Sequence, residues 1–112
     1  MAPEKELAWA AGFFDGEGST SMIVVKPERG KTEGYKHPIM RISQVGRETL
    51  ERFEAAVGVG HITGPYDTKA QPQYVWQAGS VDPSWMAAQV LWPYLSRPKR
   101  EQFARIWERV FS

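Results

Sequence analysis

The sequence contains no cysteine and only two histidines, His37 and His61, among its 112 residues. The absence of cysteine excludes a disulfide framework and any thiolate metal site. Two histidines are too few for a histidine-based zinc site without carboxylate ligands. No hydrophobic run approaches the roughly 20 residues of a membrane-spanning helix, and the first residues, MAPEKE, do not resemble a signal peptide. We therefore expect a cytoplasmic protein that does not associate with a membrane.

A strong excess of charge is also absent, because the formal net charge is only +1. The basic residues are nevertheless concentrated in two segments. Residues 18–47 contain six basic and two acidic residues, and residues 96–112 contain five basic and two acidic residues. A surface of mixed charges explains this pattern, and a basic face that binds phosphate groups is the alternative.

Large apolar side chains are plentiful. Hydrophobic residues make up 42% of the chain and charged residues 24%, as in ordinary globular proteins. Five Trp, five Phe and four Tyr provide a large area for burial in so short a chain. The length fits one domain around one hydrophobic core.

Apolar periodicity and turn residues predict an α+β fold. Helices are expected over residues 4–14, 47–57, 82–95 (or ending earlier at Pro93) and 97–111, and strands over 19–26, 36–44, 59–63 and 73–78. Loops rich in turn residues, 27–34 and 64–72, join the strands into two hairpins. The order is αββαββα followed by a C-terminal helix. It predicts one four-stranded antiparallel sheet with helices on one face and an open second face.

The strands predict a polar open face. In the second strand Arg41 and Ser43 alternate with apolar residues, and in the fourth strand Gln73 and Gln77 do the same. Arg, Ser and Gln are side chains that hydrogen-bond to base edges in the major groove of DNA, and a two-stranded ribbon fits that groove. A solvated sheet face is polar in any protein, so the pattern alone does not decide between these interpretations.

The first helix carries a stripe of small residues. Ala8, Ala11, Gly12 and Asp15 recur at helical spacing within AWAAGFFDGEG (8–18), so they share one face. Such a stripe allows two helix backbones to approach closely. The helix that packs against this stripe can belong to the same domain, or to a second copy of the chain across a two-fold axis.

Two carboxylates, Asp15 and Glu17, follow this stripe at the end of the helix. Negative charge is unfavourable at that end because the terminal carbonyl groups already carry partial negative charge. A two-fold axis would bring two copies together, and a cation between them would relieve the repulsion. Mg²⁺ suits carboxylate, carbonyl and phosphate oxygens, and carboxylates with metal beside a phosphodiester suit hydrolytic strand cleavage.

The segment AAGFFDGEG (10–18) closely resembles the motif that names the LAGLIDADG homing endonucleases. The residues identical to that motif are Ala11, Gly12, Asp15 and Gly18, and those similar in class are Ala10, Phe13, Phe14 and Glu17. The predicted αββαββα order is that family's core fold, which has a saddle-shaped sheet. A single motif in a chain of this length resembles the homodimeric class.

The resemblance implies a single LAGLIDADG-type endonuclease domain over residues 1–112. It implies an intron-encoded homing endonuclease that forms a homodimer through the first helix. Such a dimer would cut double-stranded DNA at a near-palindromic site with Mg²⁺, or another divalent ion such as Mn²⁺, and no organic cofactor. The alternatives are an inactive DNA- or RNA-binding descendant, such as a splicing helper or regulator, and a small dimeric interaction domain.

The resemblance also implies roles for residues of the motif. Glu17 matches the acidic residue that binds the catalytic metal ion, where most members have Asp. Gly16 stands where the family uses a backbone carbonyl as a further ligand. Asp15 matches the earlier acidic residue, and we expect it to be mainly structural, close to the dimer interface.

Two further segments resemble family elements near the active site. ISQV (42–45) is similar to the strand end that holds a polar residue near the attacking water, which suggests Gln44, or alternatively Arg47. LSRPKREQ (95–102) is similar to the segment with an active-site lysine, which suggests Lys99, or alternatively Arg97 or Arg100. A cation there would stabilise charge growing on the phosphate.

The basic segments coincide with the surfaces that the family's saddle presents to DNA, and a dimer doubles them. The candidate DNA-binding residues are Lys26, Arg29, Lys31, Lys36 and Arg41 for the backbone and Ser21, Arg41, Ser43, Thr63, Gln73 and Gln77 for the bases.

Overall fold

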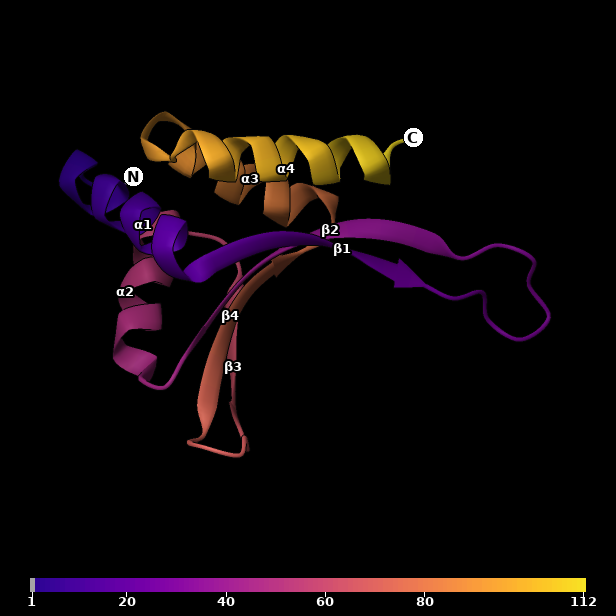
Figure 1. Ribbon diagram of the computed structural model, residues 1–112, viewed down its shortest axis with the longest axis horizontal. Helices are drawn as coiled ribbons and strands as arrows, with labels where there is room; N and C mark the ends of the chain where they lie inside the picture. The colour runs from indigo at the N-terminus through magenta and orange to yellow at the C-terminus, as the bar shows by residue number, and fades with distance from the viewer. Residues whose placement is uncertain (1) are drawn as a thin grey trace.

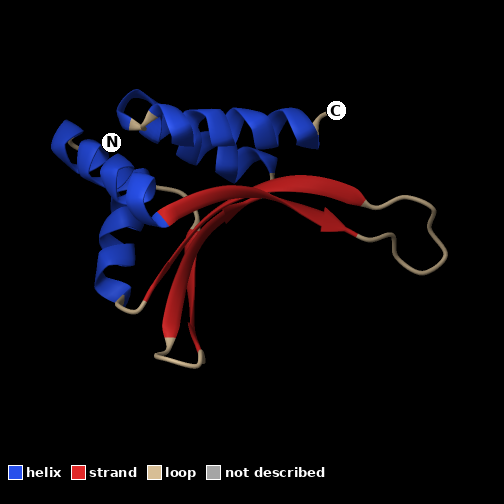
Figure 2. Cartoon of the chain, in the orientation of Figure 1, coloured by secondary structure: helices blue, strands red, loops and turns tan. Residues whose placement is uncertain are grey.

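The computed structural model describes residues 2–112 as one antiparallel sheet with helices on one face (Figure 1, Figure 2). The helices are α1 (Glu4–Glu17), α2 (Arg47–Val57), α3 (Val81–Leu91) and α4 (Arg97–Val110), with a 3₁₀ turn η1 (Trp92–Tyr94) between α3 and α4. The strands are β1 (Gly18–Val25), β2 (Tyr35–Gln44), β3 (His61–Tyr66) and β4 (Gln73–Gly79). The predicted α+β class, element order and C-terminal helix are confirmed.

The sheet has the strand order β1-β2-β4-β3, with every neighbouring pair antiparallel. Figure 1 shows the β1–β2 hairpin running out beyond the helices, while the β3–β4 hairpin turns away from it. The sheet is therefore strongly bent, and the face opposite the helices is open. Within residues 2–112, no helix combines the length and apolar character needed to cross a membrane.

The hydrophobic core lies between the helices and the inner face of β2 and β4. Trp76 and Phe53 are fully buried at its centre, with ring centroids 4.7 Å apart in an edge-to-face arrangement. Met40 and Ile42 of β2 and Phe14 of α1 complete it. Burial of each large side chain contributes about 1.5–3 kcal/mol. The core fixes which face of each strand points inward, and so which residues the open face presents.

The helix α1 is longer than the sequence predicts. We expected it to end at Phe14 because Gly16 follows, but it continues to Glu17, and β1 begins at the next residue. The Gly18 N–H donates to the Phe14 carbonyl, and a Cβ at Gly18 would overlap the Phe14 ring. Glycine is thus required at position 18 by a close approach, and the helix passes into the strand without a loop.

The strand β3 lies later in the chain than predicted, over His61–Tyr66 instead of 59–63. Gly58 and Gly60 both adopt positive φ, at 77° and 89°, and form the turn that precedes it. Beyond an irregularity after Thr63, Tyr66 pairs with Gln73, so part of the expected loop belongs to the sheet.

The large side chain of Trp85 in α3 is not buried in the core. Its side chain is 44% exposed, because α3 instead buries smaller residues such as Ser84 and Ala88. The Trp85 ring lies on α4, with its centroid 5.0 Å from that of Trp107.

Candidate active site and nucleic-acid interface

The carboxylate of Glu17 lies at the junction of α1 and β1 and is exposed. The last turn of α1 contains no basic residue, and the ion pairs found within residues 2–112 do not involve Glu17. The carboxylate is therefore free to bind a cation from solution.

The start of α4 brings Lys99 to the same junction. The Lys99 ammonium donates a hydrogen bond to the Gly18 carbonyl oxygen at 2.6 Å and lies 6.0 Å from the centroid of the Phe14 ring. Gly18 directly follows Glu17 in the chain, so a basic side chain contacts the main chain next to the residue that carries the exposed carboxylate.

The two alternatives to Lys99 point elsewhere. The Arg97 guanidinium pairs with Glu101 at 2.8 Å in solvent. Arg100 donates to the Trp92 carbonyl at 2.9 Å. Of these three basic residues, Lys99 is therefore the one that contacts the α1–β1 junction.

Asp15 is engaged within its own chain. Its carboxylate oxygens accept hydrogen bonds from the Ser96 N–H at 3.0 and 3.2 Å. Ser96 is the N-cap of α4, and its hydroxyl accepts from the Lys99 N–H at 3.4 Å. Asp15 thus fixes the start of α4 against the end of α1, which agrees with a mainly structural role, and its place at a dimer interface stays a prediction.

The stripe of small residues that α1 exposes consists of other residues than the sequence predicts. The prediction that Ala11 faces a partner is wrong, because Ala11 is fully buried in the core of its own chain. Ala8, Gly12 and Gly16 are exposed, and a Cβ added at either glycine would meet no atom within 4 Å. The surface open to a second copy is therefore Ala8, Gly12 and Gly16.

Gln44 lies near the same end of the sheet. It is half-buried, and Ile42, two residues before it, pairs with Gly18. Alternation along the strand places both side chains on the inner face. The alternative residue, Arg47, pairs with Glu51 at 2.9 Å and lies 5.7 Å from the ring of Tyr74.

The junction suits a hard divalent cation with mainly oxygen ligands. Residues 2–112 contain no group of three or more His, Asp or Glu side chains placed to hold a metal ion. The Glu17 carboxylate and the Gly16 carbonyl, which lies in the last helical turn and lacks an intrahelical partner, are donors of the type that Mg²⁺ prefers. Further ligands would have to come from a phosphate, water or a second chain.

The open face of the sheet contains a row of side chains that crosses all four strands. Ser19, Arg41, Gln77 and His61 lie directly opposite one another in β1, β2, β4 and β3. The residues predicted to read bases are exposed or half-buried and occupy outward positions in these strands: Ser21, Arg41, Ser43, Thr63, Gln73 and Gln77. Their placement on one face is thus as expected, and their contact with DNA stays a prediction.

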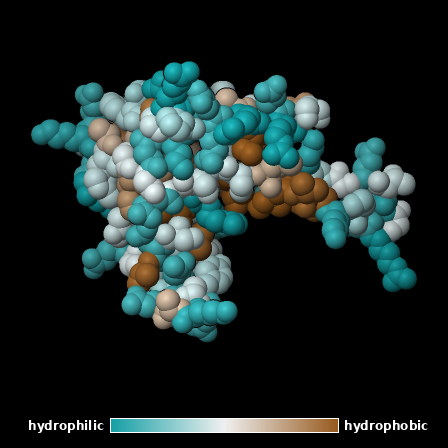
Figure 3. Space-filling view, in the orientation of Figure 1, coloured by the Kyte–Doolittle hydropathy of each residue, from teal (hydrophilic) through white to brown (hydrophobic). Residues whose placement is uncertain are grey.

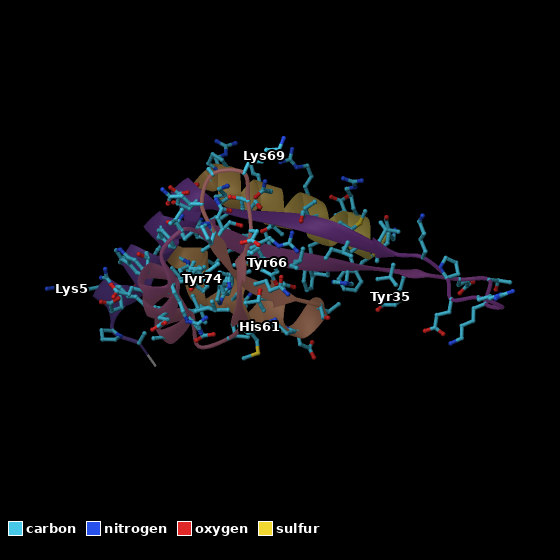
Figure 4. The ribbon with its side chains drawn as sticks, turned by 90° about the horizontal axis from the view of Figure 1, so that it is seen from below. Lys5, Tyr35, His61, Tyr66, Lys69 and Tyr74 are labelled. Atoms are coloured by element: carbon cyan, nitrogen blue, oxygen red, sulfur yellow. The ribbon has the colours of Figure 1, made fainter. Side chains whose placement is uncertain are left out.

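His61 and Tyr66 also belong to this face, although neither is among the residues predicted from the sequence to read bases. Figure 4, which views the molecule from below, labels both on the β3–β4 hairpin. The His61 Nε2 lies 3.4 Å from the Gln77 amide nitrogen, and the Tyr66 hydroxyl donates to Thr63 Oγ1 at 2.9 Å. His61 lies two residues before Thr63, so strand alternation indicates that both side chains share a face. Tyr66 could not be placed in this way because residues 64–72 are expected to form a loop.

These residues line two shallow hollows. One, of about 210 Å³, is bordered by Arg41, Thr63 and Tyr66 among others. The other, of about 440 Å³, includes both histidines. The open face is therefore hollowed, with mainly polar side chains around the smaller hollow and a largely apolar lining in the larger one.

Lys36, a candidate for binding the DNA backbone, does not lie on the open face. Its position in β2 points toward the helices, and its ammonium donates to the Arg109 carbonyl at the C-terminal end of α4, at 3.0 Å. A cation is favourable there because it opposes the helix dipole. Lys26, Arg29 and Lys31 are exposed at the tip of the β1–β2 hairpin, where Lys31 lies 3.4 Å from Glu28.

The space-filling view shows a mainly polar surface with an apolar patch where the β1–β2 hairpin leaves the helices (Figure 3). A hollow in this hairpin is lined by Val24, Val25 and Tyr35 among others. The polar tip of the hairpin thus stands apart from the body of the molecule.

No family model and no curated protein matches the sequence. Among solved structures, the homing endonuclease I-TnaI has a TM-score of 0.76 and 21% sequence identity, over 99% of this chain and 74% of that one. The archaeal intron-encoded homing endonuclease I-Vdi141I, complexed with DNA, has a TM-score of 0.70 and 23% identity, over 89% of this chain and 64% of that one. The LAGLIDADG meganuclease I-CpaMI, bound to uncleaved DNA, has a TM-score of 0.71 and 18% identity, over 94% of this chain and 35% of that one.

The chain therefore has the fold of LAGLIDADG homing endonucleases, and the resemblance seen in the sequence is confirmed at the level of the fold. It spans slightly less than two thirds of I-Vdi141I.

Proposed function

We propose that this chain, which has the fold of the LAGLIDADG homing endonucleases, is a site-specific endonuclease that hydrolyses phosphodiesters of double-stranded DNA with a divalent metal ion. The observation that carries the proposal is the α1–β1 junction. There the free Glu17 carboxylate is followed by Gly18, whose carbonyl holds the Lys99 ammonium at 2.6 Å. These contacts support a proposal in which the exposed carboxylate binds the metal ion and the Lys99 ammonium binds the phosphate at one end of the open sheet face.

In this proposal the Glu17 carboxylate and the Gly16 carbonyl hold Mg²⁺ or Mn²⁺. When bound, the ion would supply Lewis-acid polarisation of the phosphoryl group. Lys99 stabilises the negative charge that grows on the phosphate oxygens, as a preorganised cation in a partly buried site does efficiently. Gln44 orients water by hydrogen bonding from the end of β2.

The active unit is a symmetric homodimer. Each chain contributes one exposed junction carboxylate, whereas cutting both strands of a duplex requires attack at two phosphates. A two-fold contact through Ala8, Gly12 and Gly16 of α1 would bring two junctions together, because these residues leave the helix surface nearly flat. The same symmetry accounts for a near-palindromic target.

The open sheet face reads the sequence. Arg41 and Gln77, which lie opposite each other in β2 and β4, suit guanine and adenine edges respectively. Lys26, Arg29 and Lys31 of the hairpin tip bind backbone phosphates, so affinity falls as salt concentration rises.

Selection from a random double-stranded DNA library, with and without Mg²⁺, tests this function. We expect bound sequences with approximate two-fold symmetry, and cleavage products from them only when Mg²⁺ is present. Binding without cleavage in either Mg²⁺ or Mn²⁺ would indicate a nucleic-acid-binding descendant instead. Absence of DNA binding at low salt would refute both interpretations.

A further inference from the structure

The edge of β1 is covered by side chains of α4. This strand pairs with β2 on one side only, so its other side presents main-chain N–H and C=O groups that need partners. Lys99 donates to the Gly18 carbonyl at 2.6 Å, and the Gln102 amide oxygen accepts from the Thr20 N–H at 3.0 Å. Two main-chain groups on the free edge of β1, the Gly18 carbonyl and the Thr20 N–H, are thus bound by residues one turn apart on α4.

These two contacts fix the register between α4 and β1. Residues three positions apart lie on the same face of a helix, so Lys99 and Gln102 act along one line. A third contact, from Asp15 to the Ser96 N–H, holds the start of α4. Asp15 therefore secures the helix before Lys99, and Gln102 secures it after Lys99.

Gln102 is half-buried, and its contact with Thr20 lies beside buried side chains. Thr20 is 4% exposed, and its hydroxyl has no hydrogen-bond partner within residues 2–112. The neighbouring Phe103 is buried in the core. An apolar side chain at position 102 would therefore leave the Thr20 N–H without the Gln102 acceptor.

We propose that Gln102 is a positioning residue for Lys99, and this rests on the proposed nuclease function. Its amide oxygen holds α4 on the edge of β1, so that the Lys99 ammonium remains at the Gly18 carbonyl, next to Glu17. Without this contact the second turn of α4 can shift along the strand, and displacement of a catalytic group by about 1 Å can cost 10²-fold in rate.

The test compares Gln102→Met, which removes the acceptor, with Gln102→Glu, which retains an acceptor oxygen. We expect Gln102→Met to lower the single-turnover cleavage rate by about 10- to 100-fold with little change in DNA affinity. Gln102→Glu should recover most of the loss. Gln89→Met, the same change at an exposed position of α3, is the matched control and should cut at the wild-type rate.

A readout without DNA separates this proposal from the nuclease function. The Thr20 amide hydrogen should exchange with solvent faster in Gln102→Met than in Gln102→Glu. Acylation of Lys99 by a soluble reagent should also be faster in Gln102→Met. If the wild type cuts no DNA, the nuclease proposal fails, and these two rates decide the positioning role by themselves. Cleavage at the wild-type rate by folded Gln102→Met, or equal rates of Lys99 acylation in both variants, would overturn the positioning role of Gln102. Gln102→Ala replaces Gln102→Met if the latter does not fold.

Discussion

The two acidic residues of the α1–β1 junction have different environments. The Asp15 carboxylate accepts two hydrogen bonds from the half-buried Ser96 N–H, whereas Glu17 is exposed and lies outside the ion pairs found in residues 2–112. The first therefore contributes to stability, and the second is available for binding.

We expect Asp15→Ala to lower the free energy of unfolding by about 1–3 kcal/mol, because the Ser96 N–H loses its acceptor. Glu17→Ala should leave it unchanged or slightly higher, since a negative charge is removed from a helix C-terminus. Thermal unfolding of both variants measures the difference. A larger loss for Glu17→Ala than for Asp15→Ala would contradict these roles.

Thr20 carries a buried hydroxyl group without a partner in the described part of the chain. Valine has the same shape, favours strands and lacks the hydroxyl, and the main-chain contact of Thr20 with Gln102 is retained. Thr20→Val should therefore leave the free energy of unfolding unchanged or raise it by up to about 1 kcal/mol. A decrease of more than about 1 kcal/mol in chemical denaturation would show that the hydroxyl is satisfied.

At the scale of elements, α1 presents one face to its own core and another to solvent. Ala11 is fully buried, while a Cβ at Gly12 would meet no atom within 4 Å. The two positions therefore separate folding from dimer formation, although they are adjacent in the sequence.

Gly12→Leu should fold at least as well as the wild type, because leucine is a better helix former than glycine by nearly 1 kcal/mol. It should nevertheless be monomeric, since the side chain prevents close helix contact. Ala11→Leu should instead cost about 1–3 kcal/mol of stability through overpacking. Sedimentation velocity and thermal unfolding check both expectations, and a Gly12→Leu dimer would exclude this face as the interface.

The sequence allows the elements to be predicted better than their ends. The alternation in residues 36–44 and the helical spacing in 47–57 agree with β2 and α2, because one face of each is buried. The end of α1 could not be predicted, since Gly16 indicates a break that the packing of Phe14 overrides. The sequence also leaves open which of Arg97, Lys99 and Arg100 is the basic residue of the active site. The choice depends on how α4 is rotated against β1, and tertiary packing sets that rotation.

At the scale of the whole molecule, basic residues of the first basic segment, 18–47, lie on both sides of the sheet. Arg41 is exposed on the open face, whereas Lys36 of the same strand points to the end of α4. The near-neutral net charge therefore does not describe the surface that would meet DNA.

Arg41→Ala should weaken binding of a selected DNA site by about 1–3 kcal/mol and relax the preference at one base pair in each half-site. Lys36→Ala removes the same charge and should change affinity much less, because its ammonium is bound to the Arg109 carbonyl. Titration of both variants with the selected site and with one altered base pair measures these effects. Equal losses from the two substitutions would mean that charge alone determines binding.

The most direct test of the central claim is single-turnover cleavage of one selected DNA site in Mg²⁺ by the wild type, Glu17→Gln and the control Glu108→Gln. Glu108 is an exposed acidic residue of α4, and its substitution should leave both binding and cleavage close to the wild type. Glu17→Gln should bind the site with near wild-type affinity and cut it about 10²-fold more slowly or worse, as expected when charge stabilisation at the reacting phosphate is lost. Equal cleavage by the wild type and Glu17→Gln would contradict the assignment of the α1–β1 junction as the active site.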